Sequence, residues 1–338
     1  MLRQPMKDTL TSLLELIRAE TNTPALGALV GDARGIRAQA VVGIREAGKT
    51  DQARLDDPFH IGSCTKAMTA TLAARLVEQN QMRWELTVAE AFPNLKEHIH
   101  RDYQGVTLRH LLLHRSGLPE DRTPNPILFL KIRGLQGDIR QQRQQAVAWV
   151  LEQPPAAAPG TQFAYSNFGY LIAGAMLESA TGRSWEQLMR DHLFKPLKMR
   201  TAGFGVPRHF AGHTGNPPKP TFYDNPPVLG PAGTVHCSLR DWAAFVRVHL
   251  QSALGIKTPF LRPESVAELH TDPHQQGYAM GWAIPQSGVL THAGSNTLWF
   301  AVATVEPRAN RFYLVATNWG HPKAQEACRM AIQKLHEL

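Results

Sequence analysis

A serine and a lysine stand three residues apart, at Ser63 and Lys66, where an apolar run gives way to a helical pattern. On a helix, side chains at this spacing lie on one face with Cβ atoms about 5–6 Å apart, so the lysine amine can approach the serine oxygen. A serine hydroxyl is a weak nucleophile at its ordinary pKa and needs such a base. The spacing therefore predicts a nucleophile, although S-x-x-K also occurs by chance and a helical lysine is commonly a solvated surface charge.

Tyr165 and Asn167, two residues apart, form a second candidate pair. They follow a proline-rich segment, residues 154–160, and precede an apolar periodic run, which predicts a loop that enters a helix. Tyr165 would share a proton with Lys66, and the two would titrate as one coupled unit. Asn167 offers one acceptor and two donors, so it can hold both the lysine and a polar group of a substrate. The alternatives are an aromatic packing residue at Tyr165 and a helix N-cap at Asn167.

The third motif is His292-Ala293-Gly294-Ser295, between two strand-like runs. With S-x-x-K, Y-x-N and H-x-G in this order, the chain resembles the superfamily of serine β-lactamases and penicillin-binding proteins. Within it, the resemblance is to the class C-like branch, which includes family VIII-type carboxylesterases and D-aminopeptidase-like hydrolases. Further segments that resemble landmarks of this branch are residues 107–119, 231–233 and 277–282. The resemblance covers most of the chain.

This resemblance implies a role for each motif residue. Ser63 would attack the substrate carbonyl, with Lys66 and Tyr165 as the acid–base unit. The backbone N–H groups of Ser63 and Ser295 would form the oxyanion hole. A glycine in the third motif has no Cβ, which would let a substrate backbone approach closely. The residues expected to contact substrate are Asn167, His292 and Gly294. No metal and no cofactor is implied.

His292 departs from the lysine that opens this motif in β-lactamases and most penicillin-binding proteins. A histidine, with a reference pKa near 6.5, is mostly neutral at pH 7, so it would bind an anionic β-lactam less well. In the family, histidine here is seen in esterases and D-amino-acid-specific peptidases. We therefore expect a carboxylesterase acting on small acyl esters through an acyl-enzyme. The alternatives are a D,D-peptidase, a D-aminopeptidase, a weak β-lactamase, or a non-catalytic module that binds a peptidoglycan peptide or a protein partner.

Other residues that resemble reactive sites have simpler interpretations. Cys64 adjoins the proposed nucleophile but points about 100° away on a helix, so we expect a small buried side chain. Three widely separated cysteines favour free thiols over a disulfide framework. His110 and His114 have the spacing of a metal pair, but no glutamate lies between them as in H-E-x-x-H, and no metal site is expected.

The composition is that of an ordinary globular protein of 338 residues, with 43% hydrophobic and 19% charged residues. The formal charge is +8, but the basic residues are scattered, with only a loose cluster around Arg140 and Arg143, so a solvated surface is expected and nucleic-acid binding is not. No apolar run approaches the length of a membrane span. The protein would be cytoplasmic if Met1 is native, and periplasmic or secreted if a leader has been removed. The oligomeric state is left open.

The elements that must position these motifs come from both ends of the chain. Strand-like runs at 25–30 and 36–44 near the start, and at 297–305 and 312–316 near the end, must pair to bury their faces. The expected fold is α/β (α+β), with an antiparallel sheet built from both termini, flanked by helices, and an inserted all-helical domain. The expected domains are residues 1–60 with 235–338, and residues 61–234, with the active site between them. Residues 204–231, rich in proline and glycine, are expected to be an irregular connection that walls the cleft.

Overall fold

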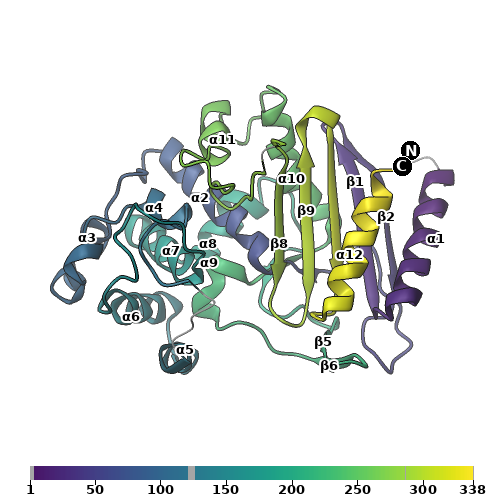
Figure 1. The fold of residues 1–338 in the computed structure, drawn as a ribbon, viewed down its shortest axis with the longest axis horizontal. Coiled ribbons are helices and arrows are strands. Elements are labelled where there is room, and N and C mark those ends of the chain that lie inside the picture. Colours follow the sequence, from purple (N-terminus) through teal and green to yellow (C-terminus); the bar gives the residue numbers. More distant parts are fainter. Residues whose placement is uncertain (1–3, 121–125, 286, 338) are drawn as a thin grey trace.

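The computed structural model describes residues 4–120, 126–285 and 287–337. Its largest sheet is antiparallel throughout and has the strand order β2-β1-β10-β9-β8, so strands from the two ends of the sequence are hydrogen-bonded side by side at β1 and β10. Figure 1 shows this sheet on the right, with the yellow C-terminal and purple N-terminal strands adjacent. The five strands are β1 (Ala25–Asp32), β2 (Gly35–Gly43), β8 (Leu290–Ser295), β9 (Phe300–Glu306) and β10 (Arg311–Thr317).

Helices cover both faces of this sheet. One face is covered by α1 (Gln4–Thr21) and α12 (Pro322–Leu335), and the other by α10 (Leu239–Ala253). Every residue of β1 is buried, because alternate side chains enter separate cores: Leu26 and Val30 pack with α1 and α12, whereas Leu29 joins the core on the opposite face. Because both faces of the strand are buried, residues 25–30 form an uninterrupted apolar segment of the sequence.

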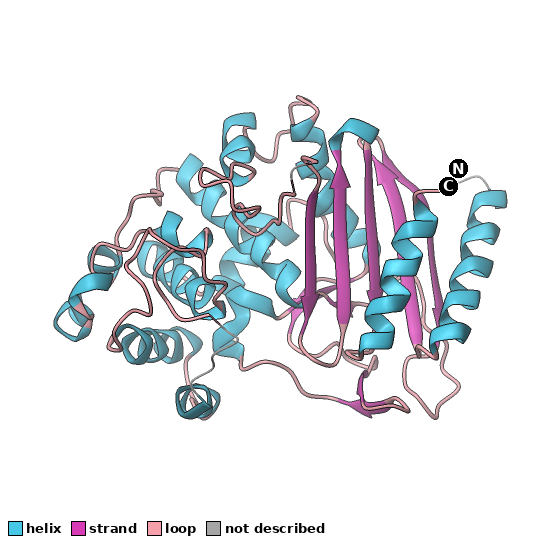
Figure 2. Cartoon of the chain, in the orientation of Figure 1, coloured by secondary structure: helices cyan, strands magenta, loops and turns pink. Residues whose placement is uncertain are grey.

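The central part of the chain is mainly helical, as Figure 2 shows in cyan on the left. Its α-helices are α2 (Thr65–Glu78), α3 (Val88–Ala91), α4 (Leu108–Leu112), α5 (Pro126–Arg133), α6 (Ile139–Leu151), α7 (Asn167–Thr181), α8 (Trp185–Met189) and α9 (Gly230–Gly233), and α11 (Pro263–Leu269) follows α10. Shorter helical turns are η1 (Gly62–Cys64), η2 (Pro93–His98), η3 (Arg101–Tyr103), η4 (Arg190–Phe194), η5 (Pro227–Leu229) and η6 (Pro307–Ala309).

Two small sheets complete the fold. One has the order β3-β7-β4 and joins the segment before Ser63 to the segment that follows the helical part. The other is a two-stranded hairpin, so the expectation of an irregular connection over residues 204–231 is wrong in part. The strands are β3 (Phe59–His60), β7 (Val235–Cys237), β4 (Gly203–Phe204), β5 (Gly212–Thr214) and β6 (Lys219–Thr221).

The expected fold class is confirmed, whereas the domain boundaries stay a prediction. The expected solvated cluster around Arg143 is wrong, because this side chain is fully buried and contacts the carboxylates of Glu178 and Glu186. Over the described residues, no helix combines the length and apolarity needed to cross a membrane. The same residues contain no cluster of three or more His, Cys, Asp or Glu side chains that could hold a metal ion.

Candidate active site

Ser63 lies in the turn η1, directly before α2, and this turn rests on strand β8. Gly62 has a positive φ of +50°, and a Cβ at this position would lie 2.4 Å from the backbone nitrogen of Ser295. A Cβ on Gly294 would lie 2.1 Å from the carbonyl oxygen of Ile61. Both positions therefore require glycine for the turn and the strand to touch. We expected a substrate backbone to approach Gly294, but on its Cβ side the group that approaches is this turn of the protein itself.

Lys66 is fully buried in the first turn of α2 and donates hydrogen bonds to three neutral oxygens. Its Nζ lies 3.1 Å from Ser63 Oγ, 2.6 Å from Asn167 Oδ1 and 2.8 Å from the carbonyl oxygen of Ala232. As an ammonium the lysine can donate to all three. As an amine it has two hydrogens for the amide and carbonyl oxygens, which only accept, and its lone pair then faces the Ser63 hydroxyl. The same geometry therefore holds Lys66 before and after it takes a proton.

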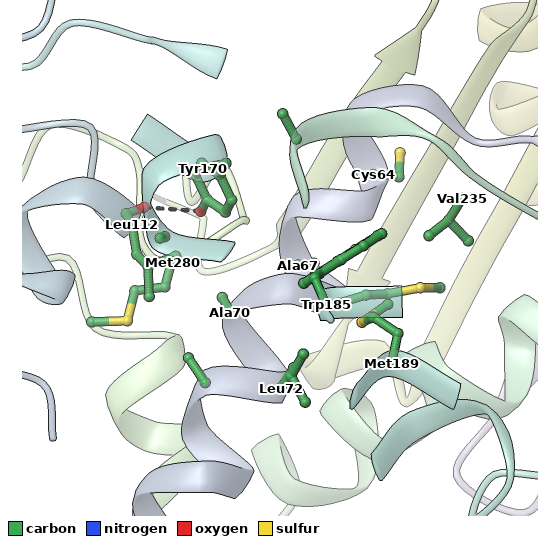
Figure 3. Close-up of a cluster of buried hydrophobic side chains, with 14 of the residues drawn as sticks. Cys64, Ala67, Ala70, Leu72, Leu112, Tyr170, Trp185, Met189, Val235 and Met280 are labelled. Atoms are coloured by element: carbon green, nitrogen blue, oxygen red, sulfur yellow. Dashed lines mark hydrogen bonds between the residues drawn. The ribbon is translucent and has the colours of Figure 1, made fainter. Parts of the chain in front are cut away.

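The partners of Lys66 come from distant elements that meet in a tightly packed core. Figure 3 shows α2 surrounded by apolar side chains, with Tyr170 of α7 donating from its hydroxyl to the carbonyl oxygen of Leu112 at 2.9 Å. Burial of Ala67, Ala70 and Leu72 along α2 fixes the direction of the helix. This packing holds the S-x-x-K pair and the start of α7 in register.

Tyr165 lies beside Lys66, with the lysine Nζ 4.9 Å from the centre of the tyrosine ring. The ring is half-buried and also packs on His114, with centroids 4.3 Å apart. The next residue, Ser166, occupies the N-cap of α7, and Asn167 is the first helical residue. The alternative role of Asn167 as the N-cap is therefore wrong, because its side-chain oxygen accepts from Lys66 instead.

His114 is a residue of this site that the sequence did not identify. Its backbone has a positive φ of +56°, and its carbonyl oxygen and Nδ1 accept from the N–H groups of Ala164 and Ser166 at 2.8 Å and 3.1 Å. Burial, with contributions from Lys66 and His292, holds the pKa of its ring well below the usual value, so the ring is neutral. His114 therefore holds the segment that carries Tyr165.

From the sequence, this histidine shows only the spacing of a metal pair with His110. The two side chains act separately, because His110 Nδ1 accepts from the N–H of Thr107 at 3.3 Å and serves the start of α4. The positive φ of His114 and its contacts to the segment of Tyr165 depend on the folded chain. The presence of His114 in the segment 107–119, which resembles a landmark of the family, is the signal that could have pointed to it.

His292 is buried within β8 and is held in one neutral form. Its Nδ1 lies 2.8 Å from the carbonyl oxygen of Ala293, so Nδ1 carries the hydrogen, and Nε2 accepts from the Tyr278 hydroxyl at 3.4 Å. Burial, and secondarily Lys66, lowers the pKa of His292 to about 3. At neutral pH the third motif therefore carries no positive charge at this residue.

The two expected oxyanion donors lie on neighbouring segments. Ser63 belongs to η1 and Ser295 ends β8, and the close approach at Gly62 brings these segments together. The Ser295 hydroxyl donates to the carbonyl oxygen of Trp299 at 2.7 Å and accepts from the N–H of Thr297 at 3.0 Å, which fixes the end of the strand. The oxyanion role of these two N–H groups stays a prediction.

A second hydrogen-bond network, which was not predicted from the sequence, connects η1 to the end of β8 through Asp224. His60 Nδ1 accepts from the Gly62 N–H at 3.1 Å, so its Nε2–H donates to Asp224 Oδ2 at 2.8 Å. The other carboxylate oxygen of Asp224 accepts from Asn296 Nδ2 at 2.8 Å. Asn296 follows Ser295, so a single carboxylate positions both the turn η1 and the end of β8.

Cys64 points away from the reacting groups. Its thiol is buried and donates to the carbonyl oxygen of His292 at 3.4 Å. Burial raises the pKa of this thiol far above its usual range, so it is not a thiolate at neutral pH. The expected small buried side chain is confirmed, as are free thiols at all three cysteines.

Comparison with known proteins decides the family. The family model described as Beta-lactamase matches residues 7–337. The chain belongs to the Beta-lactamase family. Penicillin-binding protein 4 of Amycolatopsis lactamdurans is 27% identical over 329 residues, which cover 90% of this chain and 84% of that protein.

Solved structures share the fold of this Beta-lactamase family member. A D-stereospecific amidohydrolase from Streptomyces sp. has a TM-score of 0.72 at 23% identity, covering 95% of this chain and 98% of its own. EstCE1, described as a hydrolase with promiscuous acyltransferase activity, has a TM-score of 0.79 at 16% identity, covering 98% and 99%. Membership of this family makes the protein a serine hydrolase.

Proposed function

We propose that this protein is a carboxylesterase that hydrolyses small uncharged acyl esters through an acyl-enzyme on Ser63. The observation that carries the proposal is the neutral, buried His292 in the third motif. A lysine at this position would offer a permanent charge to a substrate carboxylate, and a histidine with a pKa of about 3 does not. A substrate without a carboxylate beside its scissile bond loses nothing in such a site.

The contacts of Lys66 support the first chemical step. Ser63 Oγ attacks the ester carbonyl, and the serine proton passes to the Lys66 amine 3.1 Å away. Asn167 and Ala232 keep their hydrogen bonds to the lysine through this transfer because both oxygens only accept. The negative charge on the carbonyl oxygen is stabilised by the N–H groups of Ser63 and Ser295.

The second step returns the proton. The acid–base unit of Lys66 and Tyr165 protonates the departing alkoxide, which leaves as an alcohol while the acyl group stays on Ser63. The same unit then removes a proton from water, the resulting hydroxide attacks the acyl-enzyme, and the carboxylic acid is released as Ser63 regains its hydrogen. The ring of Tyr165 beside Lys66 supports this shared role.

A substrate panel tests the proposal. We expect kcat/KM for p-nitrophenyl acetate and butyrate to exceed that for D-alanine p-nitroanilide and for a chromogenic cephalosporin. The activity should disappear in Ser63→Ala and persist in Cys64→Ala, the matched control one residue away. A kcat/KM for the amide or the cephalosporin equal to or above that of every ester would overturn the esterase assignment.

His292→Lys tests the carrying observation. A hydrogen bond to a charged group contributes roughly 1.5–3 kcal/mol, so a lysine here should improve the KM for the anionic cephalosporin by about 10- to 150-fold relative to that for the esters. An unchanged ratio of the two KM values would show that the charge of the third motif does not select the substrate.

A further inference from the structure

A hollow lined by basic and apolar side chains lies away from Ser63. It has a volume of about 500 Å³, within the range of ligand pockets. The segments that form it are the C-terminal part of α2, α10, and residues 196–198 and 258–260. Three cations line it, Arg75, Lys198 and Arg247, and no carboxylate is among its lining residues.

These three cations form no ion pair in the described part of the chain. None has a carboxylate oxygen within 4.0 Å, although ion pairs occur elsewhere on the surface. The Nε–H groups of Arg75 and Arg247 are buried and donate no hydrogen bond within residues 4–120, 126–285 and 287–337, whereas the Nη1 atoms donate to the carbonyl oxygens of Phe260 and Arg34. Arg75 is half-buried, with its guanidinium 4.3 Å from the centre of the Phe260 ring. Two partly buried cations, Arg75 and Arg247, beside the exposed Lys198 and without an ion pair, favour the binding of an anion.

Nearby carboxylates are engaged elsewhere. Glu78, one turn after Arg75 on α2, accepts from the N–H of Arg262 at 2.7 Å and from the Ser265 hydroxyl at 2.6 Å. Asp191 is paired with Arg183 and Lys195. These carboxylates therefore form no ion pair with the three cations, and the charge of Glu78 acts on Arg75 only from a distance, by partly opposing the lowering of its pKa by burial.

The basic surface extends beyond this hollow. Lys198 also lines an adjoining hollow with Arg190 and Arg200, and Arg247 lines another with Arg240. These residues are scattered along the sequence, and the fold gathers them. The charge of Arg75 also acts on a residue outside the hollow, since the pKa of His192 is lowered by burial and then by Arg75.

The remaining walls of the hollow indicate the rest of the ligand. They are apolar or aromatic at Leu197, Val248 and Phe260, with the neutral polar side chains of Gln251 and Thr258 between them. A bare inorganic ion would leave these apolar walls uncovered.

We propose that this hollow binds a small phosphate monoester whose organic part is apolar or aromatic. The phosphate dianion would lie among Arg75, Lys198 and Arg247, and the organic part would pack against Phe260 and its apolar neighbours. A tetrahedral group with several acceptor oxygens can be reached by cations from three separate segments. The proposal is independent of the esterase assignment.

Isothermal titration calorimetry with phenyl phosphate at pH 8 and low ionic strength tests this site. We expect saturable binding of one molecule per chain, and at least about tenfold weaker binding in Lys198→Gln/Arg247→Gln. The matched control is Arg308→Gln/Lys323→Gln, which removes the same charge from exposed positions elsewhere and should bind as the wild type does. Lys198→Gln alone, at an exposed position, should weaken binding without a risk to folding.

Two comparisons complete the test. Inorganic phosphate should bind more weakly than phenyl phosphate, and benzyl alcohol should not bind measurably. Equal losses in the two double variants would show an effect of net charge and overturn the site, as would the absence of saturable binding to the wild type. Equal affinity for phosphate and phenyl phosphate would overturn recognition of the organic part. Unchanged ester hydrolysis and melting temperature without ligand would show that the variants are folded.

Discussion

Lys66 and Arg143 are both fully buried basic side chains, and the hydrogen bonds described for each go to different kinds of acceptor. Arg143 contacts the carboxylates of Glu178 and Glu186 and donates to two backbone carbonyl oxygens. Burial lowers its pKa, but these two carboxylates raise it more, so the guanidinium is permanently charged. The hydrogen bonds that Lys66 makes to Ser63, Asn167 and Ala232 go to neutral oxygens.

We propose that this difference separates a structural charge, Arg143, from a residue that carries a proton in catalysis, Lys66. Two carboxylates around Arg143 fix one charge state and join α6, α7 and α8. The oxygens of Asn167 and Ala232 can accept from Lys66 as an ammonium or as an amine. Lys66 donates to Ser63 Oγ in the first form and accepts from the Ser63 hydroxyl in the second. The expected consequence is that loss of Lys66 removes activity and loss of Arg143 removes stability.

The largest expected effect is on turnover. Lys66→Ala and Tyr165→Phe should each lower kcat for p-nitrophenyl butyrate by at least about 10²-fold, with smaller changes in KM, because general-base catalysis contributes about 10²–10⁴-fold. Since the two residues act as one unit, the double variant should lose little more than the worse single variant. Fully additive losses would show that they act independently. Steady-state kinetics on folded protein gives the answer.

Arg143→Met should lower the stability of the protein and leave its turnover nearly unchanged. It leaves the buried Glu178 and the partly buried Glu186 without their cation, and breaking a buried ion pair typically costs about 3–5 kcal/mol of unfolding free energy. Denaturant unfolding would measure this loss, and kcat per folded molecule should stay near that of the wild type at low temperature. Arg329→Met, whose arginine is exposed and paired with Glu326, should change stability by less than about 1 kcal/mol. Equal losses in the two variants would contradict the structural role of Arg143.

Parts of this comparison were predictable from the sequence. The i, i+3 spacing gave the contact of Lys66 with Ser63, because local geometry on one helix decides it. The strand runs at both ends gave the antiparallel sheet. The hydrogen bond from Lys66 to the Ala232 carbonyl was not predictable, since this carbonyl is 166 positions away in the chain and reaches the lysine only through tertiary packing.

Other failures have the same origin. Arg143 looked solvated because its partners lie 35 and 43 residues further along. The contact of Gly294 with substrate stays a prediction, whereas the approach of the turn at Ile61 to its Cβ side could not be predicted, because it depends on the fold. The basic hollow at Arg75 was hidden for the same reason, because its cations are distant in the sequence.

His114 offers a smaller effect that sharpens the account of Tyr165. His114→Asn keeps an acceptor near the Nδ1 position for the Ser166 N–H and tolerates the positive φ. His114→Phe keeps a ring against Tyr165 but removes the acceptor. If the hydrogen bond positions the segment, the phenylalanine variant should lose about tenfold more kcat than the asparagine variant, with KM little changed. Equal kcat values would contradict this role of the hydrogen bond, and a larger loss in the asparagine variant would assign the effect to ring packing.

The smallest expected effect is on the pH dependence of stability. The His270 ring, whose Nε2 lies 2.9 Å from His249 Nδ1, has its pKa lowered by burial to about 4. The unfolded chain therefore binds a proton below pH 6.5 that the folded chain does not, and stability falls as pH decreases from about 6.5 to 4. His270→Gln should reduce this slope by up to about 1.4 kcal/mol per pH unit in urea unfolding. The exposed control His98→Gln should leave the slope unchanged, and equal slopes in all three proteins would contradict the buried neutral pair.

The central claim is that Ser63, activated by a lysine among neutral acceptors, becomes acylated. Treatment with a fluorophosphonate probe, followed by intact-mass analysis and peptide mapping, tests this most directly. The account predicts one adduct per chain on the peptide that contains Ser63, abolished in Ser63→Ala, slowed in Lys66→Ala and retained in Cys64→Ala. An adduct on Cys64, or undiminished labelling of Ser63→Ala, would contradict it.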